Sequence, residues 1–335
     1  MPNMKVLIIG GTGLISTAIT QRLLKTGSTV VHINRGLTPP RYKGEVTEIV
    51  CDRNTPEFPQ TLRSNGPYDV VIDMCCYHKD QLWSAISGVQ GITKQFIFCS
   101  TVDVYRKPAA TFPITEDEAL LGHTTYAQNK IACEDLVMTS ARDGAFEGTI
   151  IRPSCTYGEG GKIVHTFGWE TWFLSRLAEG LPVVLCGDGT SIWSWCHVDD
   201  EALAFVGACL NPAAYGRRYH AASDELMTWN ASVMTIAAAM DAPPPKIVHI
   251  PVDMLHQIAP DQSQISWDNF AWPNFYDNTH AKTDLGFATT VPFAKGAKRT
   301  IDWIKKNEGF KPVADDPVTD RVLLAWDKAR KVFLS

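Results

Sequence analysis

The stretch Lys5–Ser16, KVLIIGGTGLIS, decides the fold of this chain of 335 residues. Lys5–Ile9 is a short apolar run typical of a buried strand, and Leu14–Lys25 has the pattern of a helix that Gly27 closes. A glycine-rich turn joins the two runs. The sequence therefore predicts a strand, a tight turn and a helix in succession near the start of the chain.

The glycines of this turn favour a phosphate ligand. Gly10 permits the tight turn, and Gly13 has no Cβ, so a pyrophosphate can approach the backbone. The helix that follows offers N–H groups and the positive end of its dipole to phosphate. Ser16 takes the place of the usual third glycine and is small enough for close contact between helix and strand. We predict a dinucleotide-binding loop whose cofactor-binding residues are Gly10, Thr12, Gly13, Leu14 and Ile15.

Similar apolar runs follow along the first half of the chain. They carry little polar alternation, as expected of strands buried on both faces, and helical patterns separate them. Strands that alternate with helices predict parallel βαβ units and hence an α/β fold with a doubly wound parallel Rossmann sheet. The runs are Thr29–Ile33, Thr47–Val50, Val70–Met74, Gln95–Cys99 and Thr149–Ile151.

The composition changes after about Pro153, where glycine, proline and tryptophan become frequent. Later in the chain, Asp199–Leu210 is predicted as a helix with an Asp N-cap, and Tyr219–Ala222 as a late strand that returns to the sheet. The expected organisation is a dinucleotide-binding Rossmann domain of residues 1–156, with 192–222 returning to it, and a smaller C-terminal substrate-binding lobe of residues 157–191 and 223–335.

The second predicted strand ends in HINRG, which bears on the choice of cofactor. A site that prefers NAD commonly has an acidic residue here for the ribose 2′-OH. This chain has Asn34 and Arg35, and an arginine can pair with the 2′-phosphate of NADP. NADP is therefore favoured over NAD, and a solvated Arg35 is the alternative interpretation. Asp52 and Arg53 follow the third strand and are placed to meet the adenine end of the cofactor.

Tyr126 and Lys130 are four residues apart at the start of a predicted helix that runs to about Arg142. This spacing puts both side chains on one face, where an ammonium group lowers the pKa of a nearby phenol. Such a tyrosine can move a proton at a carbonyl or carbinol while hydride moves to or from nicotinamide. The preceding strand ends in hydroxyl residues, at the sheet edge where open α/β sheets bind ligands. We expect Tyr126 to be the acid/base, and Lys130 also to hold the nicotinamide ribose.

The glycine loop, the hydroxyl residues and the Tyr126–Lys130 pair follow the order of a known family. The chain resembles the extended short-chain dehydrogenases, in particular the NAD(P)-dependent epimerase/dehydratase branch. The likeness continues in VVIDMCC, IIRPSCTYGEG, GDGTSIWSWCHVDDEA and DNTHAKTDLGF. The resemblance implies that Thr101 is the catalytic Ser/Thr beside Tyr126 and Lys130. It also implies cofactor contacts from Cys75, Cys76 and Pro153.

Two departures from the family pattern bear on the substrate. Sugar-nucleotide dehydratases carry adjacent acidic residues after the catalytic threonine, whereas here Val102 takes the first place and only Asp103 remains. Without that acid we expect no dehydration. Trp193 stands where nucleotide-sugar enzymes usually have an arginine for the substrate diphosphate; a neutral indole can stack on a ring but cannot neutralise a diphosphate. The predicted substrate-binding residues are Thr101, Asp103 and Trp193.

Composition limits the remaining function classes. The net charge of −5 argues against a nucleic-acid partner, which needs clustered Lys and Arg. No apolar stretch reaches membrane-spanning length and the N-terminus lacks a long apolar region, so we expect a cytoplasmic protein without a membrane partner. The nine cysteines mostly sit in apolar stretches without a CxxC, which indicates reduced thiols, and no metal site is expected. The family likeness suggests a homodimer.

These observations predict NADP- or NAD-dependent hydride transfer at a secondary alcohol or ketone of a sugar-like or polyhydroxylated small molecule. Two net outcomes stay open: a redox reaction with exchange of cofactor, which Arg35 favours, and epimerisation with retained cofactor, which the family likeness favours. The alternative from another class is a catalytically silent cofactor-binding or RNA-binding protein on the same fold. The set of Thr101, Tyr126 and Lys130 speaks against that alternative.

Overall fold

The computed structural model describes residues 4–334 and divides the chain into two compact units. The first unit holds the residues up to Thr156, with Val198–Ser223 and Tyr276–Thr290; the second holds Tyr157–His197, Asp224–Phe275 and the residues from Val291 on. Two boundaries differ from the expected ones. Residues 192–197 belong to the second unit, because they pair there with residues 226–228, and residues 276–290 join the first unit.

A seven-stranded sheet forms the centre of the first unit, in the order β10-β6-β5-β4-β1-β2-β3, and all its paired strands are parallel. The strand order reverses between β1 and β4, the place where open α/β sheets bind ligands at the carboxyl ends of strands. The predicted doubly wound parallel Rossmann sheet is confirmed. Its strands are β1 (Lys5–Ile9), β2 (Thr29–Asn34), β3 (Thr47–Val50), β4 (Tyr68–Asp73), β5 (Thr93–Cys99), β6 (Glu147–Pro153) and β10 (Arg217–Ala221).

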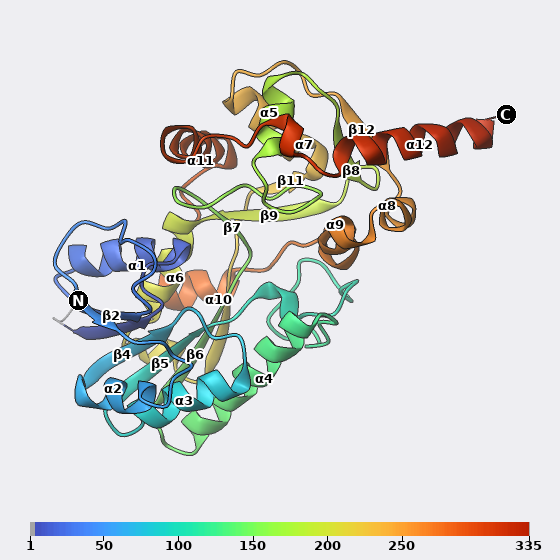
Figure 1. Ribbon diagram of the computed structural model, residues 1–335. Coiled ribbons are helices and arrows are strands. Elements are labelled where there is room, and N and C mark those ends of the chain that lie inside the picture. Colours follow the sequence, from blue (N-terminus) through green and yellow to red (C-terminus); the bar gives the residue numbers. More distant parts are fainter. Residues whose placement is uncertain (1–3, 335) are drawn as a thin grey trace. The chain divides into compact units, whose positions relative to one another are not determined.

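Helices cover both faces of this sheet, with α1, α6 and α10 packed together on one face and α2, α3 and α4 on the other (Figure 1). α6 begins at Val198, directly after a strand, so Asp199 lies in its first turn and the predicted Asp N-cap is wrong. The helices are α1 (Leu14–Lys25), α2 (Phe58–Ser64), α3 (Lys79–Val89), α4 (Thr125–Arg142), α6 (Val198–Ala208) and α10 (Thr279–Leu285), with short 3₁₀ turns η1 (Val102–Val104) and η2 (Pro212–Ala214).

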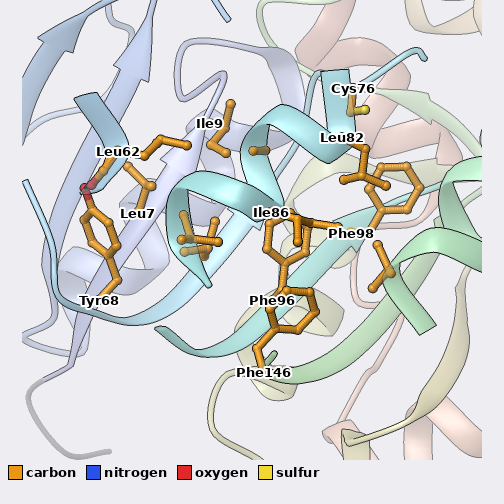
Figure 2. Packing of buried hydrophobic residues seen from close by; sticks show 14 of the residues in the cluster. Leu7, Ile9, Leu62, Tyr68, Cys76, Leu82, Ile86, Phe96, Phe98 and Phe146 are labelled. Carbon is orange, nitrogen blue, oxygen red and sulfur yellow. Dashed lines mark hydrogen bonds between the residues drawn. The ribbon is translucent and has the colours of Figure 1, made fainter. Parts of the chain in front are cut away.

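A hydrophobic cluster of the first unit lies between the sheet and α2, α3 and α4 (Figure 2). Phe96 of β5 stacks on Phe146, with ring centroids 5.1 Å apart, and Ile86 of α3 belongs to the same cluster. Burial of such side chains removes apolar area from water, worth about 25 cal/mol for each Å². This packing fixes β4 and β5, and therefore the strand ends at which the candidate site is built.

The second unit consists of short strands and helices. β9 pairs antiparallel with β11, and β8 pairs parallel with β12. A short strand, β7 (Cys155–Tyr157), spans the boundary between the units. The other elements are α5 (Trp172–Ala178), β8 (Val183–Cys186), β9 (Ile192–His197), β11 (Leu226–Thr228), α7 (Trp229–Ala239), β12 (Ile247–Ile250), α8 (Val252–Ile258), α9 (Pro260–Ile265), η3 (Ser266–Phe270), α11 (Phe293–Asn307), η4 (Val313–Asp315) and α12 (Thr319–Leu334). Within residues 4–334, every helix is too short or too polar to cross a membrane.

Candidate active site

The glycine turn leads from β1 into α1 and packs tightly against its neighbours. Gly10 has a φ of +85°, and a Cβ there would lie 2.7 Å from Sγ of Cys75. A Cβ on Gly11 would lie 2.2 Å from the His32 ring. Because neither gap can hold another carbon atom, both positions require glycine for packing, and the positive φ of Gly10 requires it there for the turn as well.

Gly13 and Ser16 shape the N-terminus of α1. Gly13 is the N-cap and places no side chain over the N–H groups of the first turn, which suits a phosphate there. Oγ of Ser16 donates a hydrogen bond of 2.7 Å to the carbonyl of Gly10. Ser16 therefore ties the first helical turn to the glycine turn, a role beyond the small size expected of it.

A cavity of about 340 Å³, here called the dinucleotide cavity, lies where β1, β2, β3 and β4 end. The glycine turn forms part of its wall, so the residues present fit a dinucleotide. Most of the predicted cofactor-binding residues line it: Gly10, Thr12, Gly13, Asn34, Arg35, Asp52, Arg53 and Cys75. The remaining lining residues were not predicted from the sequence, because they belong to no motif: Ile9, Ile33, Leu37, Thr38, Cys51, Asn54, Phe58, Tyr77 and Gln81.

The two residues at the end of β2 have different tasks. The Asn34 side chain is engaged in the turn: Nδ2 donates to Glu48 at 2.9 Å, and Oδ1 accepts from the N–H of Gly36 at 2.8 Å. Arg35 is exposed and lines the dinucleotide cavity. A guanidinium in this position suits a phosphate better than a bare ribose hydroxyl.

Arg53 lines the dinucleotide cavity, but its charge is directed elsewhere. Nη1 and Nη2 donate to the two carboxylate oxygens of Asp73 at 2.8 and 3.0 Å, and Nη2 also donates to the carbonyl of Gln81 at 3.0 Å. Both Arg53 and Asp73 are buried. A bidentate pair with a buried carboxylate holds the guanidinium of Arg53 and directs it away from a bound adenine. The prediction that Arg53 meets the adenine end is corrected for this group. Asp52, on the same wall, accepts from the N–H of Asn54 at 2.9 Å.

The two cysteines after β4 also differ in position. Cys75 lines the dinucleotide cavity, whereas Cys76 is fully buried in the hydrophobic cluster with Leu82 (Figure 2). Sγ of Cys76 lies 3.9 Å from Sγ of Cys133. The Cys76 side chain therefore faces the core and gives no support to the predicted cofactor contact, which stays a prediction. Leu14 lines neither this cavity nor the one described next.

A second cavity of about 200 Å³, here called the tyrosine cavity, brings together the three residues predicted to be catalytic. Thr101 follows the end of β5, and Tyr126 and Lys130 come from α4. Tyr77 lines both cavities, so the two share a wall. The other lining residues are Ile15, Met74, Cys99, Ser100, Pro153, Ser154 and Thr156. Ser154 and Thr156 belong to the stretch after Arg152-Pro153, which the family likeness predicts to approach the nicotinamide.

α4 sets the positions of Tyr126 and Lys130. Oγ1 of Thr124, the N-cap, accepts a hydrogen bond of 3.1 Å from the N–H of Ala127, which fixes where the helix begins. Nζ of Lys130 donates to the carbonyl of Cys99 at 2.8 Å and lies 5.8 Å from the centre of the Tyr126 ring. The lysine thus connects α4 with the end of β5.

The Tyr126 phenol has a pKa above its ordinary value. Burial is the main cause, and a hydrogen bond with Thr101 opposes it only in part. Tyr126 as a whole is 39% exposed, so the burial concerns the part of the ring that lines the cavity. The expected lowering of this pKa by Lys130 is corrected, because desolvation outweighs the favourable interactions. The phenol is neutral at neutral pH and can donate a proton.

Two predicted substrate-binding residues have other partners. Asp103 accepts a hydrogen bond of 2.8 Å from Nζ of Lys107 and does not line the tyrosine cavity. Trp193, in the second unit, is buried and packs against Trp229 and Phe270, with ring centroids 5.3 and 5.1 Å away. The structure thus gives Asp103 an ion pair and Trp193 a place in an aromatic cluster, and their roles toward a substrate stay predictions.

Known proteins resemble this chain in sequence. The model of the NAD dependent epimerase/dehydratase family matches residues 71–222. The 2'-dehydrokanamycin reductase of Streptomyces kanamyceticus is 25% identical over 240 residues, which cover 72% of this chain and 68% of the reductase. The chloroplast stem-loop binding protein of 41 kDa b of Arabidopsis thaliana is 26% identical over 258 residues, which cover 73% of this chain and 65% of that protein. The matches thus span about two thirds of these relatives.

A solved structure shares the fold. The UDP-glucuronic acid 4-epimerase from Bacillus cereus in complex with NAD matches with a TM-score of 0.71 and 20% identity, over 90% of this chain and 99% of that chain. Together with the strand order and the site, these findings define an enzyme of the extended short-chain dehydrogenase type. The match to the NAD-dependent epimerase/dehydratase family model over residues 71–222 confirms the resemblance inferred from the motifs.

Proposed function

We propose that this enzyme catalyses nicotinamide-dependent hydride transfer at a secondary alcohol or ketone of a sugar-like or polyhydroxylated small molecule. The observation that carries the proposal is the convergence of Thr101, Tyr126 and Lys130 on one cavity. Tyr77 borders this cavity and also the dinucleotide cavity. A cofactor in the latter could therefore direct its reactive ring toward the three side chains.

The neutral phenol of Tyr126 supplies a proton to the ketone oxygen during reduction and takes it back during oxidation. The Thr101 hydroxyl bonds the same substrate oxygen and holds it in place. Lys130, anchored on the carbonyl of Cys99, places its ammonium group near the phenol and stabilises the phenolate that forms. A bound nicotinamide would supply or accept the hydride, and Lys130 would also hold its ribose.

We propose NADP as the preferred cofactor. Arg35 supports this preference, because it is exposed at the dinucleotide cavity where a 2′-phosphate would enter. Asn34 supports it indirectly: both ends of its amide are used within the protein, so it is a poor acceptor for a ribose hydroxyl. The glycine turn and the N-terminus of α1 would hold the pyrophosphate of either cofactor.

Two features favour net reduction or oxidation over epimerisation. NADP is commonly exchanged between turnovers, and the 2'-dehydrokanamycin reductase, a relative at 25% identity, is named for a reduction. Trp193 in place of a cationic residue makes a nucleotide diphosphate a poor substrate. We therefore propose a carbonyl reductase or alcohol dehydrogenase for a neutral, hydroxyl-rich molecule, working as a cytoplasmic homodimer.

The stem-loop binding relative supports a second candidate, RNA binding on the same fold. The net charge of −5 disfavours it, because RNA phosphates require clustered cations. A mobility-shift titration with structured RNA at physiological salt distinguishes the candidates: RNA binding that is independent of cofactor, without turnover of any sugar-like ketone, would favour the second.

The direct test begins with the purified protein. We expect extracts of denatured enzyme, or calorimetric titration of the native protein, to show binding of NADP(H), and a panel of keto-sugars and aminoglycoside ketones to oxidise NADPH. Tyr126→Phe should bind the cofactor yet fail to turn over. Absence of nicotinamide binding by the intact protein would refute the proposed function.

A further inference from the structure

Glu201 is a buried carboxyl group that the proposed mechanism does not use. It lies in the first turn of α6 and is 0% exposed. The side-chain contact that the structure gives it is the hydroxyl of Thr156, whose Oγ1 lies 2.8 Å from one carboxyl oxygen and 2.9 Å from the other. Thr156 lines the tyrosine cavity, so Glu201 stands directly behind the cavity wall.

This environment favours the neutral acid. One hydroxyl can donate to only one of the two oxygens at a time, and a buried carboxylate needs more compensation than that. Burial raises the pKa of Glu201 well above its ordinary value, and the nearby Asp200 acts in the same direction, while the bond with Thr156 opposes both. Glu201 therefore holds a proton of its own to donate at neutral pH.

The proton on Glu201 decides what Thr156 presents to the cavity. When the acid donates to Oγ1 of Thr156, the hydroxyl proton of Thr156 is released for another acceptor. Within the protein that acceptor is the carbonyl of Ser154, at a long 3.3 Å. Oγ of Ser154 is itself buried without a hydrogen-bond partner in the structure, and Ser154 lines the same cavity. This wall thus has two hydroxyl groups that could bond a ligand: that of Ser154 has no partner in the structure, and the proton of Thr156 has only a long bond to a carbonyl when Glu201 is the donor.

We propose that Glu201 is a positioning residue of the tyrosine cavity: as the neutral acid it donates to Thr156 and makes the Thr156 hydroxyl a hydrogen-bond donor to a carbonyl oxygen of a bound molecule. The carbonyl comes either from the carboxamide of nicotinamide or from the ketone substrate, because both groups present the same acceptor. The inference rests on the proposed function, in that it assigns a bound molecule to this cavity.

The first test does not depend on turnover. Infrared spectra of the wild-type protein at neutral pH should contain a carboxylic-acid C=O band that Glu201→Gln removes. Asp200→Asn is the matched control, because the neighbouring Asp200 accepts from Thr290 at 2.9 and 2.6 Å instead of facing the cavity. If Glu201→Gln removes only carboxylate bands, Glu201 is ionised and the inference is overturned.

The second test compares isosteric variants. An amide can still donate to Thr156, so Glu201→Gln should retain binding and turnover, whereas Glu201→Met should lose roughly two- to tenfold, the range of a single hydrogen bond. Thr156→Val should lose as much as Glu201→Met, Thr156→Ser should retain function, and the double variant should be no worse than Thr156→Val alone. Equal losses in Glu201→Gln and Glu201→Met, or multiplying losses in the double variant, would overturn the inference.

Two readouts identify the source of the carbonyl. If Glu201→Met binds NADPH less tightly in the absence of substrate, the carbonyl belongs to the carboxamide of the cofactor. If NADPH affinity is unchanged and only kcat/KM falls, the carbonyl belongs to the substrate. Far-ultraviolet circular dichroism and melting temperature confirm folding, and a misfolded Glu201→Met is replaced by Thr156→Val, which leaves α6 untouched. If no substrate is turned over, the proposed function is in doubt, while the infrared and NADPH-binding measurements still decide the inference.

Discussion

Nζ of Lys130 and the carbonyl oxygen of Cys99 lie 2.8 Å apart, and this hydrogen bond joins the helix that carries Tyr126 to the strand that precedes Thr101. Lys130 is only 3% exposed, so its charge acts in a region with little water. A charge–dipole contact of this kind is stronger there than at the surface. The lysine therefore has a positioning task in addition to its proposed contacts with the phenol and the ribose.

Lys130→Met should lose both turnover and cofactor affinity. Methionine keeps the apolar stem but removes the charge, the bond to Cys99 and the proposed ribose contact. We expect the dissociation constant of NADPH, measured by fluorescence titration, to rise by about tenfold, and kcat to fall by at least about 100-fold. Unchanged NADPH affinity in a folded Lys130→Met variant would contradict the ribose contact.

Arg35→Asp should reverse the cofactor preference. The wild type is expected to bind NADP more tightly than NAD, because the Arg35 guanidinium pairs with the 2′-phosphate. Aspartate repels that phosphate and accepts from the ribose 2′-OH, so the variant should prefer NAD. Calorimetry with both cofactors measures the preference. The control is Arg63→Asp, which changes an arginine of α2 that does not line the dinucleotide cavity. Wild-type protein that binds NAD equally well would defeat the prediction.

The enzyme should form no 4-keto-6-deoxy product from nucleotide-sugars. Val102 occupies the place of the family's dehydratase acid, and it is 8% exposed within a cluster that contains Val104 and Tyr105. The valine side chain has no carboxyl group with which to protonate a leaving hydroxyl. Mass spectrometry after incubation with dTDP- and UDP-sugars measures this, with an authentic dehydratase run in parallel. A dehydrated product would show that another group supplies the proton.

His165 should make the protein less stable in acid. Its ring is buried and stacks on Phe173, with centroids 4.7 Å apart, and burial lowers its pKa from 6.5 to about 3. Between these values the unfolded chain binds a proton that the folded chain does not, so stability falls as the pH drops from about 6.5 toward 3. One such group contributes a slope of up to about 1.4 kcal/mol for each pH unit.

Urea unfolding at several pH values between 7 and 4 tests the role of His165. His165→Gln should flatten the pH dependence of the unfolding free energy by about one proton, even if its stability at neutral pH is lower because the bond with the carbonyl of Glu170 changes. The same slope in variant and wild type would assign the acid sensitivity to other groups. His220, whose pKa burial also lowers to about 3, is the next candidate.

The features predicted most accurately from the sequence are the strands and helices, because backbone geometry and apolar periodicity determine them. The strand Lys5–Ile9 and the helix Leu14–Lys25 have the predicted bounds, and the parallel sheet follows from the alternation of strands and helices. Thr101, Tyr126 and Lys130 were expected at one place because strand ends gather at one edge of such a sheet. These features depend on local pattern and on topology, which a single sequence contains.

Side-chain partners were harder to predict, because they depend on residues distant in sequence. Arg53 follows a strand end near the cofactor, yet its partner Asp73 is twenty residues away on another strand. Cys76 follows Cys75 directly, and only the packing of α3 and α4 decides that it faces the core. The raised pKa of Tyr126 has a similar origin, since desolvation is a property of the folded cavity and not of the YxxxK spacing.

Tyr126→Phe decides whether the chain is the enzyme proposed here. The substitution removes one hydroxyl and leaves a ring that still packs beside Tyr77, 6.4 Å away between centroids. The fold and the affinity for NADPH should therefore hold. Without its proton donor the developing alkoxide retains only Thr101, and since general acid–base catalysis is worth about 10²–10⁴-fold, kcat should fall by at least about 100-fold.

The comparison of Tyr126→Phe with Lys130→Met and Tyr77→Phe separates the roles at this site. Tyr77→Phe removes a hydroxyl from the same cavity but not the proposed proton donor, so it should keep most of the activity. Lys130→Met should lose cofactor affinity that Tyr126→Phe keeps. Steady-state kinetics and NADPH titrations on all three variants measure these differences. Near-normal turnover of an authentic substrate by Tyr126→Phe would mean that a different group moves the proton, and the assignment of this cavity as the site of hydride transfer would have to be abandoned.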